Sequence, residues 1–329
     1  MNYVELGQTG EKVSEMCLGT MMFGTRCDEA EADRILGTAI DHGVTFIDTA
    51  AMYGDGRTEE ILGHIIKDKR DQLFIATKVH KGVDAQSILE SIDESLSRLQ
   101  TDFVDLYMIH WPVPGMHPEE IMQALNRVVE QRKARYVGCS NYPAWLLAHS
   151  NGIAARNGWA RLICNQVAYN LFERGIEVEI LPQAVAEGVA ITTYRPLAEG
   201  LLTGKYQAGT PLPADSRGQV SPLVITWLSQ YGESVDRSNR FAAELGVHPA
   251  QLALAWVRYS PAVTAPIVGV SALHHLETAL GGFGLDLTPA QYDAVTHMFD
   301  TAVKEESYQR FPGRRFNFPR LRRNLDLLG

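Results

Sequence analysis

A carboxylate, a phenol, an ammonium and an imidazole follow separate apolar runs of the sequence. Asp48 ends one run and Tyr53 comes shortly after it. Lys78 and His110 end two later runs. An ammonium beside a phenol favours the phenolate and lowers the phenol pKa from its usual value of about 10. Asp48 would keep Lys78 charged and His110 would hydrogen-bond a substrate oxygen, so the set could protonate an oxygen that becomes alkoxide-like.

This set of side chains supplies a proton but no electrons. The cysteines at positions 17, 27, 139 and 164 are widely spaced and form no C-x-x-C pair. No metal-ligand cluster stands out, so no metal site is predicted. A reduction at this place would therefore need an organic hydride donor.

The four residues can act together only if separate strands bring them to one place. Short β-branched apolar runs alternate with longer amphipathic stretches, which is typical of βα units around a parallel sheet. The expected strands cover residues 14–19, 45–48, 73–78, 103–110, 136–140, 162–166, 190–194 and 264–269. We therefore expect an α/β protein with one (β/α)8 TIM barrel domain over residues 1–329, whose strand ends meet at one rim.

The stretches between the strands predict helices that would surround the barrel. They cover residues 28–42, 57–67, 85–99, 118–132, 143–156, 175–187 and 249–259, with extra C-terminal helices at 273–280 and 289–299. Each is amphipathic enough to cover a sheet.

Three segments fall outside the βα pattern. Residues 1–13 contain a Thr9-Gly10 turn signal and predict an N-terminal β-hairpin that caps the bottom of the barrel. Residues 206–232 are rich in proline and glycine and predict a long loop, which would cover a cofactor. Residues 300–329 form an arginine-rich, aromatic C-terminal tail of unassigned structure.

The charge of the chain narrows its partners. It has 30 Lys and Arg against 39 Asp and Glu, a formal net charge of -9 without a basic patch. This disfavours a nucleic-acid partner, which requires clustered cations. No signal peptide and no apolar run of roughly 18 residues is evident, so we expect a cytoplasmic protein without a membrane partner. A small-molecule substrate fits, and a homo-oligomer stays open.

Polar residues also stand at the ends of the later strands. Ser140-Asn141, Asn165-Gln166 and Tyr194-Arg195 follow the fifth, sixth and seventh strands, and Ser271 follows the eighth. Taken singly, each has an ordinary structural explanation as a cap, a solvated side chain or a core hydrogen bond. Their joint position on the rim that carries Asp48 and Lys78 predicts a site at the barrel mouth.

Several segments in order resemble one known family. Residues 46–54 (FIDTAAMYG), 59–63 (EEILG), 105–112 (DLYMIHWP), 137–142 (VGCSNY) and 200–206 (GLLTGKY) resemble the aldo-keto reductases. The pattern is closest to bacterial members related to the potassium-channel β subunits. The resemblance implies an NAD(P)H-dependent reduction of aldehydes or ketones, or the reverse oxidation, without a Rossmann domain or a metal. The absence of a G-x-G-x-x-G motif after the first strand agrees.

The resemblance also assigns roles to residues. Tyr53 would be the general acid, Lys78 and Asp48 would tune it, and His110 would orient the carbonyl. Ser140, Asn141 and Gln166 would bind the nicotinamide amide, and Tyr194 would stack on its ring. The full implied cofactor set is Gly19, Thr20, Met21, Asp48, Ser140, Asn141, Gln166, Tyr194, Arg195, Pro196, Leu197, Gly200, Lys205, Arg217, Gly269, Ser271 and His275.

The phosphate-binding part of this set decides between NADP and NAD. Leu197, Gly200 and Lys205 match the belt over the pyrophosphate, where backbone N–H groups and an ammonium offset charge. Arg217 and Ser271 would face the adenosine phosphate. Where relatives grip the adenosine end with Gln or Arg, Glu and Asn, this chain has His275, Thr278 and Ala279. We expect NADP as the cofactor, with NAD as the second option, and Arg195 adds a cation near its phosphates or an anionic substrate.

Residues next to the catalytic set would line the substrate. They are Phe23, Tyr53, His110 and Trp111, with Met22 and Met52 nearby. Aromatic and thioether side chains make an apolar surface with little stereochemical preference. We expect a neutral aldehyde or ketone, such as a sugar-derived or xenobiotic carbonyl compound.

Two other classes of function fit the same barrel. One is a regulatory subunit that binds the nucleotide without turnover, although such relatives typically lack the histidine found here at position 110. The other is an aldolase or lyase in which Lys78 forms a Schiff base.

Overall fold

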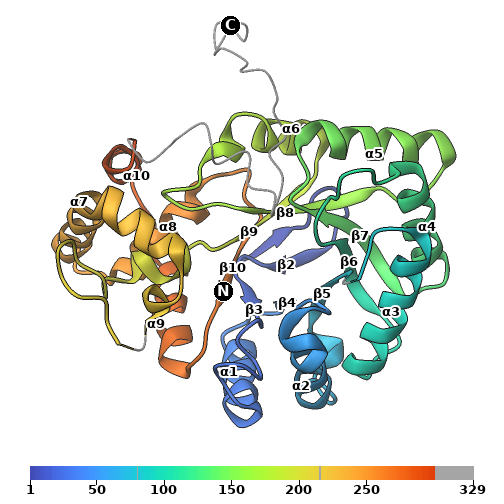
Figure 1. Ribbon diagram of the computed structural model, residues 1–329, viewed down its shortest axis with the longest axis horizontal. Coiled ribbons are helices and arrows are strands. Elements are labelled where there is room, and N and C mark those ends of the chain that lie inside the picture. The colour runs from blue at the N-terminus through green and yellow to red at the C-terminus, as the bar shows by residue number, and fades with distance from the viewer. Residues whose placement is uncertain (80, 215, 301–329) are drawn as a thin grey trace, which may run out of the picture.

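Eight parallel strands close into a barrel, and helices surround it on the outside (Figure 1). The computed structural model describes residues 1–79, 81–214 and 216–300, so the expected tail beyond Asp300 lies outside the described residues. The barrel strands are β3 (Cys17–Gly19), β4 (Phe46–Asp48), β5 (Phe74–Lys78), β6 (Val104–Ile109), β7 (Ala134–Ser140), β8 (Leu162–Ala168), β9 (Ala190–Tyr194) and β10 (Ala265–Gly269). The predicted (β/α)8 fold is confirmed.

Side-chain alternation along the strands places the polar residues of the rim. In β4, Phe46 belongs to the cluster that fills the barrel interior, so Asp48, two residues later, also points inward. In β5, Phe74 and Ala76 belong to the same interior cluster, and Lys78 continues their face. The intervening residues face the helices. The barrel closes where β10 pairs with β3.

Helices follow the strands in the expected order. In the described part of the chain they are α1 (Glu29–Asp41), α2 (Arg57–Ile65), α3 (Ala85–Leu99), α4 (Pro118–Glu130), α5 (Ala144–Asn157), α6 (Ile180–Glu187), α7 (Pro222–Glu244), α8 (Pro249–Tyr259), α9 (Leu273–Phe283) and α10 (Pro289–Met298). Aspartates cap two of them: Asp28 accepts from the Glu31 N–H and Asp84 from the Ser87 N–H. None of these helices combines the length and the apolar character that a bilayer crossing requires.

The N-terminal hairpin closes the bottom of the barrel, as the sequence predicts. Strands β1 (Tyr3–Glu5) and β2 (Lys12–Ser14) pair antiparallel. Leu6, in the turn between them, is fully buried in the barrel's interior cluster. Gly7 has a φ of 60°, and a Cβ there would lie 2.7 Å from the Gly188 carbonyl oxygen. The turn therefore needs glycine where it meets the start of β9.

Leu6→Ala is expected to lower the free energy of unfolding by about 2–5 kcal/mol, because it removes a fully buried side chain from the barrel bottom and leaves a cavity. Urea unfolding followed by tryptophan fluorescence measures this loss. Val4→Ala, at a partly buried position of the same hairpin, serves as the control. An equal loss in both variants would show that Leu6 adds nothing specific to the core.

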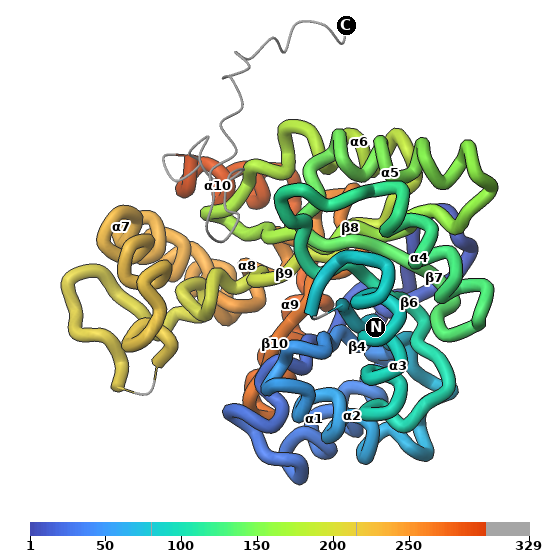
Figure 2. The backbone as a smooth tube through the Cα atoms, turned by 45° about the vertical axis from the view of Figure 1, so that its right-hand side comes forward, coloured from blue at the N-terminus to red at the C-terminus, as the bar shows by residue number. Residues whose placement is uncertain are grey.

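The segment expected as a loop over residues 206–232 is only partly a loop. A 3-10 turn, η5, covers Arg217–Gln219, and α7 begins at Pro222, so the prediction was wrong for the last eleven residues. Pro222 lies in the first turn, where a backbone N–H would have no partner within the helix, so its missing N–H costs no hydrogen bond. The Ser221 hydroxyl caps the helix. Proline there marked a helix start rather than a loop. Figure 2 shows α7 at the edge of the molecule, beside α8 and away from α1–α6.

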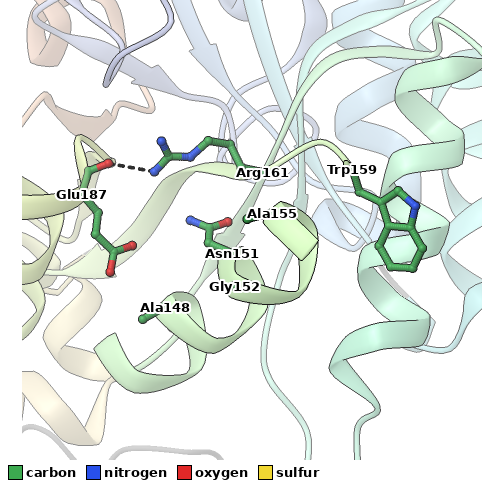
Figure 3. A pocket seen from close by; sticks show the side chains of 7 residues that line it. All are labelled: Ala148, Asn151, Gly152, Ala155, Trp159, Arg161 and Glu187. Carbon is green, nitrogen blue, oxygen red and sulfur yellow. Dashed lines mark hydrogen bonds between the residues drawn. The ribbon is translucent and has the colours of Figure 1, made fainter. Parts of the chain in front are cut away.

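A surface hollow of about 460 Å³ lies at the other end of the barrel from the strand carboxyl ends. Its residues lie on α5, just before β8, or at the end of α6. Figure 3 shows Arg161 reaching the main-chain oxygen of Glu187, at 2.8 Å. The lining residues are Ala148, Asn151, Gly152, Ala155, Trp159, Arg161 and Glu187. It shares none of them with the rim.

Candidate active site

A buried ion pair lies at the top of the barrel. The Lys78 Nζ donates to Asp48 Oδ1 and to the Thr49 main-chain oxygen, both at 2.7 Å. Lys78 is 0% exposed and Asp48 3% exposed. Gln166 Nε2 also donates to Asp48 Oδ1, at 2.7 Å. Such a pair is retained in a dry interior only when its hydrogen bonds are satisfied, and here Asp48 accepts two.

Tyr53 extends over this pair from the loop after β4. It begins the 3-10 turn η1 (Tyr53–Gly56), which leads directly into α2. The Lys78 Nζ lies 5.2 Å from the Tyr53 ring centroid, so the ammonium acts electrostatically on the phenol. The His110 ring stands edge-on to it, with centroids 6.1 Å apart. The four residues predicted from separate strand ends therefore meet at one place.

The pKa shifts of the pair differ in part from the expectation. Burial raises the pKa of Tyr53 above its usual value, and the Lys78 ammonium opposes that rise without cancelling it. Burial alone would lower the pKa of Lys78, but Asp48 and Tyr53 outweigh it and the pKa is raised. The predicted net lowering of the phenol pKa is thus absent in the free protein. Tyr53 is protonated and Lys78 is charged at neutral pH.

The predicted nicotinamide residues gather next to the ion pair. The Asn141 amide donates to the His110 main-chain oxygen at 3.2 Å and accepts from the Tyr194 hydroxyl at 2.8 Å. The Ser140 hydroxyl donates to the Gln166 main-chain oxygen at 2.8 Å. Asn141 has a φ of 62°, in the left-handed region that asparagine tolerates. These bonds tie β6, β7, β8 and β9 together at the rim.

The segment after β9 folds into consecutive left-handed turns. Arg195, Ala198, Glu199 and Gly200 all have positive φ, the last at 92°. A Cβ on Gly200 would lie 3.1 Å from the Lys205 Nζ, so the missing side chain lets the ammonium approach the backbone. This is a cradle that suits a phosphate.

Arg195, expected near the cofactor phosphates or an anionic substrate, forms an ion pair within its own segment and keeps 39% of its side chain exposed. Its Nε lies 3.2 Å from Glu199 Oε1. The other Glu199 oxygen accepts from the Ser221 hydroxyl at 2.5 Å. Glu199, which sequence reasoning missed, therefore joins the rim segment to the start of α7.

The predicted adenosine end lies around the start of α9. The Ser271 hydroxyl and His275 Nδ1 are 3.4 Å apart, and burial, His274 and Lys205 together lower the His275 pKa. His275 is therefore neutral at pH 7. Glu31 of α1 accepts from the Leu273 N–H, at 2.8 Å. A carboxylate thus already occupies the first turn of α9.

Arg217 begins a neighbouring turn, η5 (Arg217–Gln219). The Gly218 N–H donates to the Tyr206 hydroxyl at 2.9 Å, which places η5 beside Lys205. η5 also contacts η4 (Ala198–Thr203), the turn that carries Gly200. The two predicted phosphate cations therefore come from adjoining segments.

The remaining predicted residues divide between the rim and the core. Gly19 pairs with Gly269 across β3 and β10, and the buried Thr20 hydroxyl donates to the Asp48 main-chain oxygen at 3.0 Å. Met21 and Met52 are exposed and Trp111 is half-buried. Leu197 and Pro196 lie in the segment after β9. Phe23, expected on the substrate side, is 0% exposed and belongs to the core between barrel and helices.

A second buried carboxylate near the site was also missed. Glu59, 0% exposed, accepts from the Thr77 hydroxyl at 2.6 Å and from Arg98 Nε at 2.7 Å. Its signal was available, because the EEILG motif follows Tyr53 closely and Thr77 precedes Lys78. Strand alternation turns Thr77 outward, toward α2.

The rim suits a nicotinamide nucleotide at two of its three parts. The amide side chains of Asn141 and Gln166 and the ring of Tyr194 suit a planar ring that carries a carboxamide. The backbone around Gly200, together with Lys205, suits a diphosphate. The adenosine end suits a 2′-phosphate less well, because Glu31 holds the start of α9. Among the described residues, no group of three His, Cys, Asp or Glu is placed to hold a metal ion.

The fold and the rim together define the class of protein. A closed (β/α)8 barrel carries a buried lysine–aspartate pair in contact with a tyrosine at its mouth. The model of the Aldo/keto reductase family matches residues 15–299. The chain belongs to this family.

Individual relatives carry names of two kinds. The uncharacterized oxidoreductase YrpG of Bacillus subtilis is 33% identical over 307 residues, which is 87% of this chain and 92% of the relative. The versiconal hemiacetal acetate reductase of Aspergillus parasiticus is 33% identical, covering 88% of this chain and 95% of the relative. A probable voltage-gated potassium channel subunit beta of Arabidopsis thaliana is 34% identical, covering 94% and 100%. The family and the first two names support an oxidoreductase.

Proposed function

We propose that the protein reduces a small aldehyde or ketone to an alcohol, or runs the reverse oxidation, with NADPH as the hydride donor. The observation that carries this proposal is the contact between Tyr53 and a lysine with no exposed surface, itself paired with Asp48. A phenol in this setting is a proton donor whose conjugate base is stabilised in place. The relative named as a reductase and the relative named as an oxidoreductase support it.

The residues of the rim would divide the work as follows. A bound nicotinamide nucleotide would supply the hydride to the carbonyl carbon. Tyr53 gives its proton to the carbonyl oxygen, and the Lys78 ammonium stabilises the phenolate that remains. Asp48 holds Lys78 charged and oriented, and His110 hydrogen-bonds the same oxygen and orients it. In the reverse direction the phenolate takes the proton from the alcohol.

The test is turnover with a panel of neutral aldehydes and ketones and either reduced nucleotide. We expect loss of the reduced nicotinamide absorbance, matched by alcohol formation. Tight nucleotide binding without turnover on any member would instead support a nucleotide-binding regulatory subunit; the Arabidopsis relative is named as a probable potassium channel subunit beta.

The Schiff-base alternative requires a neutral amine at Lys78. The raised pKa of Lys78 keeps it charged, so it is a poor nucleophile. Borohydride trapping with a carbonyl substrate should leave Lys78 unmodified. A covalent adduct on it would overturn the reductase assignment.

NAD is a second candidate cofactor because of one observation. Glu31 places a carboxylate at the start of α9, beside Ser271 and His275. There it takes the Leu273 N–H that a 2′-phosphate could otherwise use, and its other oxygen pairs with Arg34. Arg217 and Lys205 act in the opposite direction. Equilibrium titration with both nucleotides compares these effects directly, and NADP affinity at or above that for NAD supports the first candidate.

Lys205→Ala and Arg217→Ala are each expected to raise the nucleotide Kd by about tenfold, which is about 1.4 kcal/mol, because each removes one phosphate cation. At saturating nucleotide, kcat should stay within about twofold. Lys69→Ala is a matched control, since Lys69 pairs with Asp33 on the lower side of the barrel. Ordinary affinity in both rim variants would place the phosphates elsewhere.

A further inference from the structure

We infer that Glu59 is a positioning residue that fixes Tyr53 relative to Lys78, an inference that rests on the proposed function. Its carboxylate joins the two elements that carry these groups. Glu59 lies in the first turn of α2, six residues after Tyr53, and it accepts from the hydroxyl of Thr77, the residue before Lys78 in β5. One hydrogen bond of 2.6 Å therefore ties the phenol's segment to the ammonium's strand.

The Tyr53 segment needs such an external support. Gly54, Asp55 and Gly56 all have positive φ, and Asp55 at 52° carries the cost of the left-handed region without being glycine. α2 begins at Arg57, and its N-cap residue, Gly56, provides no side-chain hydrogen bond. Backbone in sparsely populated regions persists only when its surroundings determine it. The position of Tyr53 thus depends on what holds the first turn of α2.

Two fully buried neighbours in that turn provide the support, each toward a different strand. The Thr58 hydroxyl donates to the Phe23 main-chain oxygen at 2.9 Å, in the loop after β3. Glu59 faces β5. Because successive barrel strands are bonded to each other, these two contacts fix α2 over β4, from which Tyr53 extends.

Arg98 of α3 neutralises the charge of the buried Glu59 carboxylate. Its Nε donates to Glu59 Oε2 at 2.7 Å while its side chain stays 22% exposed. A Cβ on Gly56 would lie 2.9 Å from Arg98 Cδ, and a Cβ on Gly63 would lie 2.4 Å from the Arg98 main-chain oxygen. Both glycines leave room for α3 beside α2. The motif from Tyr53 to Gly63 is therefore one junction, with Glu59 at its centre.

The sharpest test removes the hydrogen bond alone. Thr77→Val keeps the shape of the side chain and leaves the Glu59–Arg98 pair intact. We expect kcat for carbonyl reduction to fall about tenfold, because small displacements of a reacting group are costly. The KM for the carbonyl and the nucleotide Kd should stay within about twofold. Glu59→Ala should lower kcat further. Glu59→Gln, which keeps an acceptor for the Thr77 hydroxyl, should retain most of the wild-type kcat.

A matched control separates positioning from stability. Asp105 is 2% exposed and pairs with Arg70 and Arg135 near the start of β6, at the far end of the barrel. Asp105→Asn should lower the Tm at least as much as Thr77→Val and leave kcat unchanged. An unchanged kcat in Thr77→Val, or an equal kcat loss in Asp105→Asn, overturns the inference.

Hydrogen–deuterium exchange tests the same inference without requiring catalytic activity. Amides of residues 53–57 should exchange faster in Thr77→Val and Glu59→Ala and at the wild-type rate in Asp105→Asn. If wild-type protein turns over no carbonyl compound, the proposed function fails while this readout still applies. Unchanged exchange at residues 53–57 in both Thr77→Val and Glu59→Ala would contradict the positioning role.

Discussion

Replacing Tyr53 by phenylalanine is expected to lower kcat for carbonyl reduction by about 10²- to 10⁴-fold, the range typical of a lost general acid. The substitution removes the hydroxyl that we propose as the proton donor and keeps the ring that lies against His110 and Lys78. Nucleotide affinity should be nearly unchanged, because the phenol is expected to hold no phosphate. Steady-state kinetics and nucleotide fluorescence titration measure the two quantities separately.

Tyr107→Phe is the matched control for this variant. Tyr107 is fully buried and its hydroxyl donates to the Ile88 main-chain oxygen at 3.0 Å, on the helix side of β6. The control loses one buried hydrogen bond and should be less stable with normal kcat. Loss of nucleotide affinity in parallel with kcat in Tyr53→Phe would mean that Tyr53 holds the cofactor rather than the proton.

The strand pattern was sufficient to place the central groups. Phe46 and Phe74 had to face a packed barrel interior, and a period of two then carried Asp48 and Lys78 inward at the same rim. The hairpin at residues 1–13 followed from its turn signal in the same way. These features depend on local periodicity, which a single sequence contains.

Features that depend on how elements pack were beyond the sequence. The Glu59–Arg98 pair joins two helices, and its geometry requires the rotation of α2 on α3. The ion pair between Arg195 and Glu199 depends on a left-handed turn that the sequence did not indicate. Phe23 was expected at the mouth because it follows a strand, yet the loop folds it into the core. None of these packing arrangements produces a periodic pattern in the sequence.

The pKa of Tyr53 shows the same limit in energetic form. A neighbouring ammonium was predicted to lower it, and the ammonium is present. The net direction, however, is set by how much water burial removes from the phenol, which only the packed structure shows. Burial outweighs Lys78, so the free protein holds a protonated phenol ready to donate.

This balance determines the pH dependence of both directions. Reduction requires the protonated phenol, so it should be constant at neutral pH and fall only as pH rises through the raised Tyr53 pKa, above the usual value of about 10. Alcohol oxidation requires the phenolate, so it should rise with pH over the same interval. Measuring kcat as a function of pH for reduction and for oxidation tests whether the Tyr53 pKa is raised.

Lys78→Met is expected to shift the pH dependence of reduction and of oxidation, and to lower kcat for carbonyl reduction by about 10²-fold or more. Without the ammonium, burial and Asp48 both raise the Tyr53 pKa, so the oxidation limb should shift to higher pH and the phenolate left by reduction loses its stabilising charge. The variant also leaves Asp48 buried without its cation, which costs about 3–5 kcal/mol of stability.

The double variant Asp48→Asn with Lys78→Met separates the two effects. It removes the unpaired charge, so stability should return toward that of the wild-type protein while the activity stays low. The single and double variants are compared by urea unfolding and by pH profiles of alcohol oxidation. An oxidation limb at the wild-type pH in Lys78→Met would show that the ammonium does not act on the phenol, and recovery of kcat in the double variant would assign the proton transfer to another group.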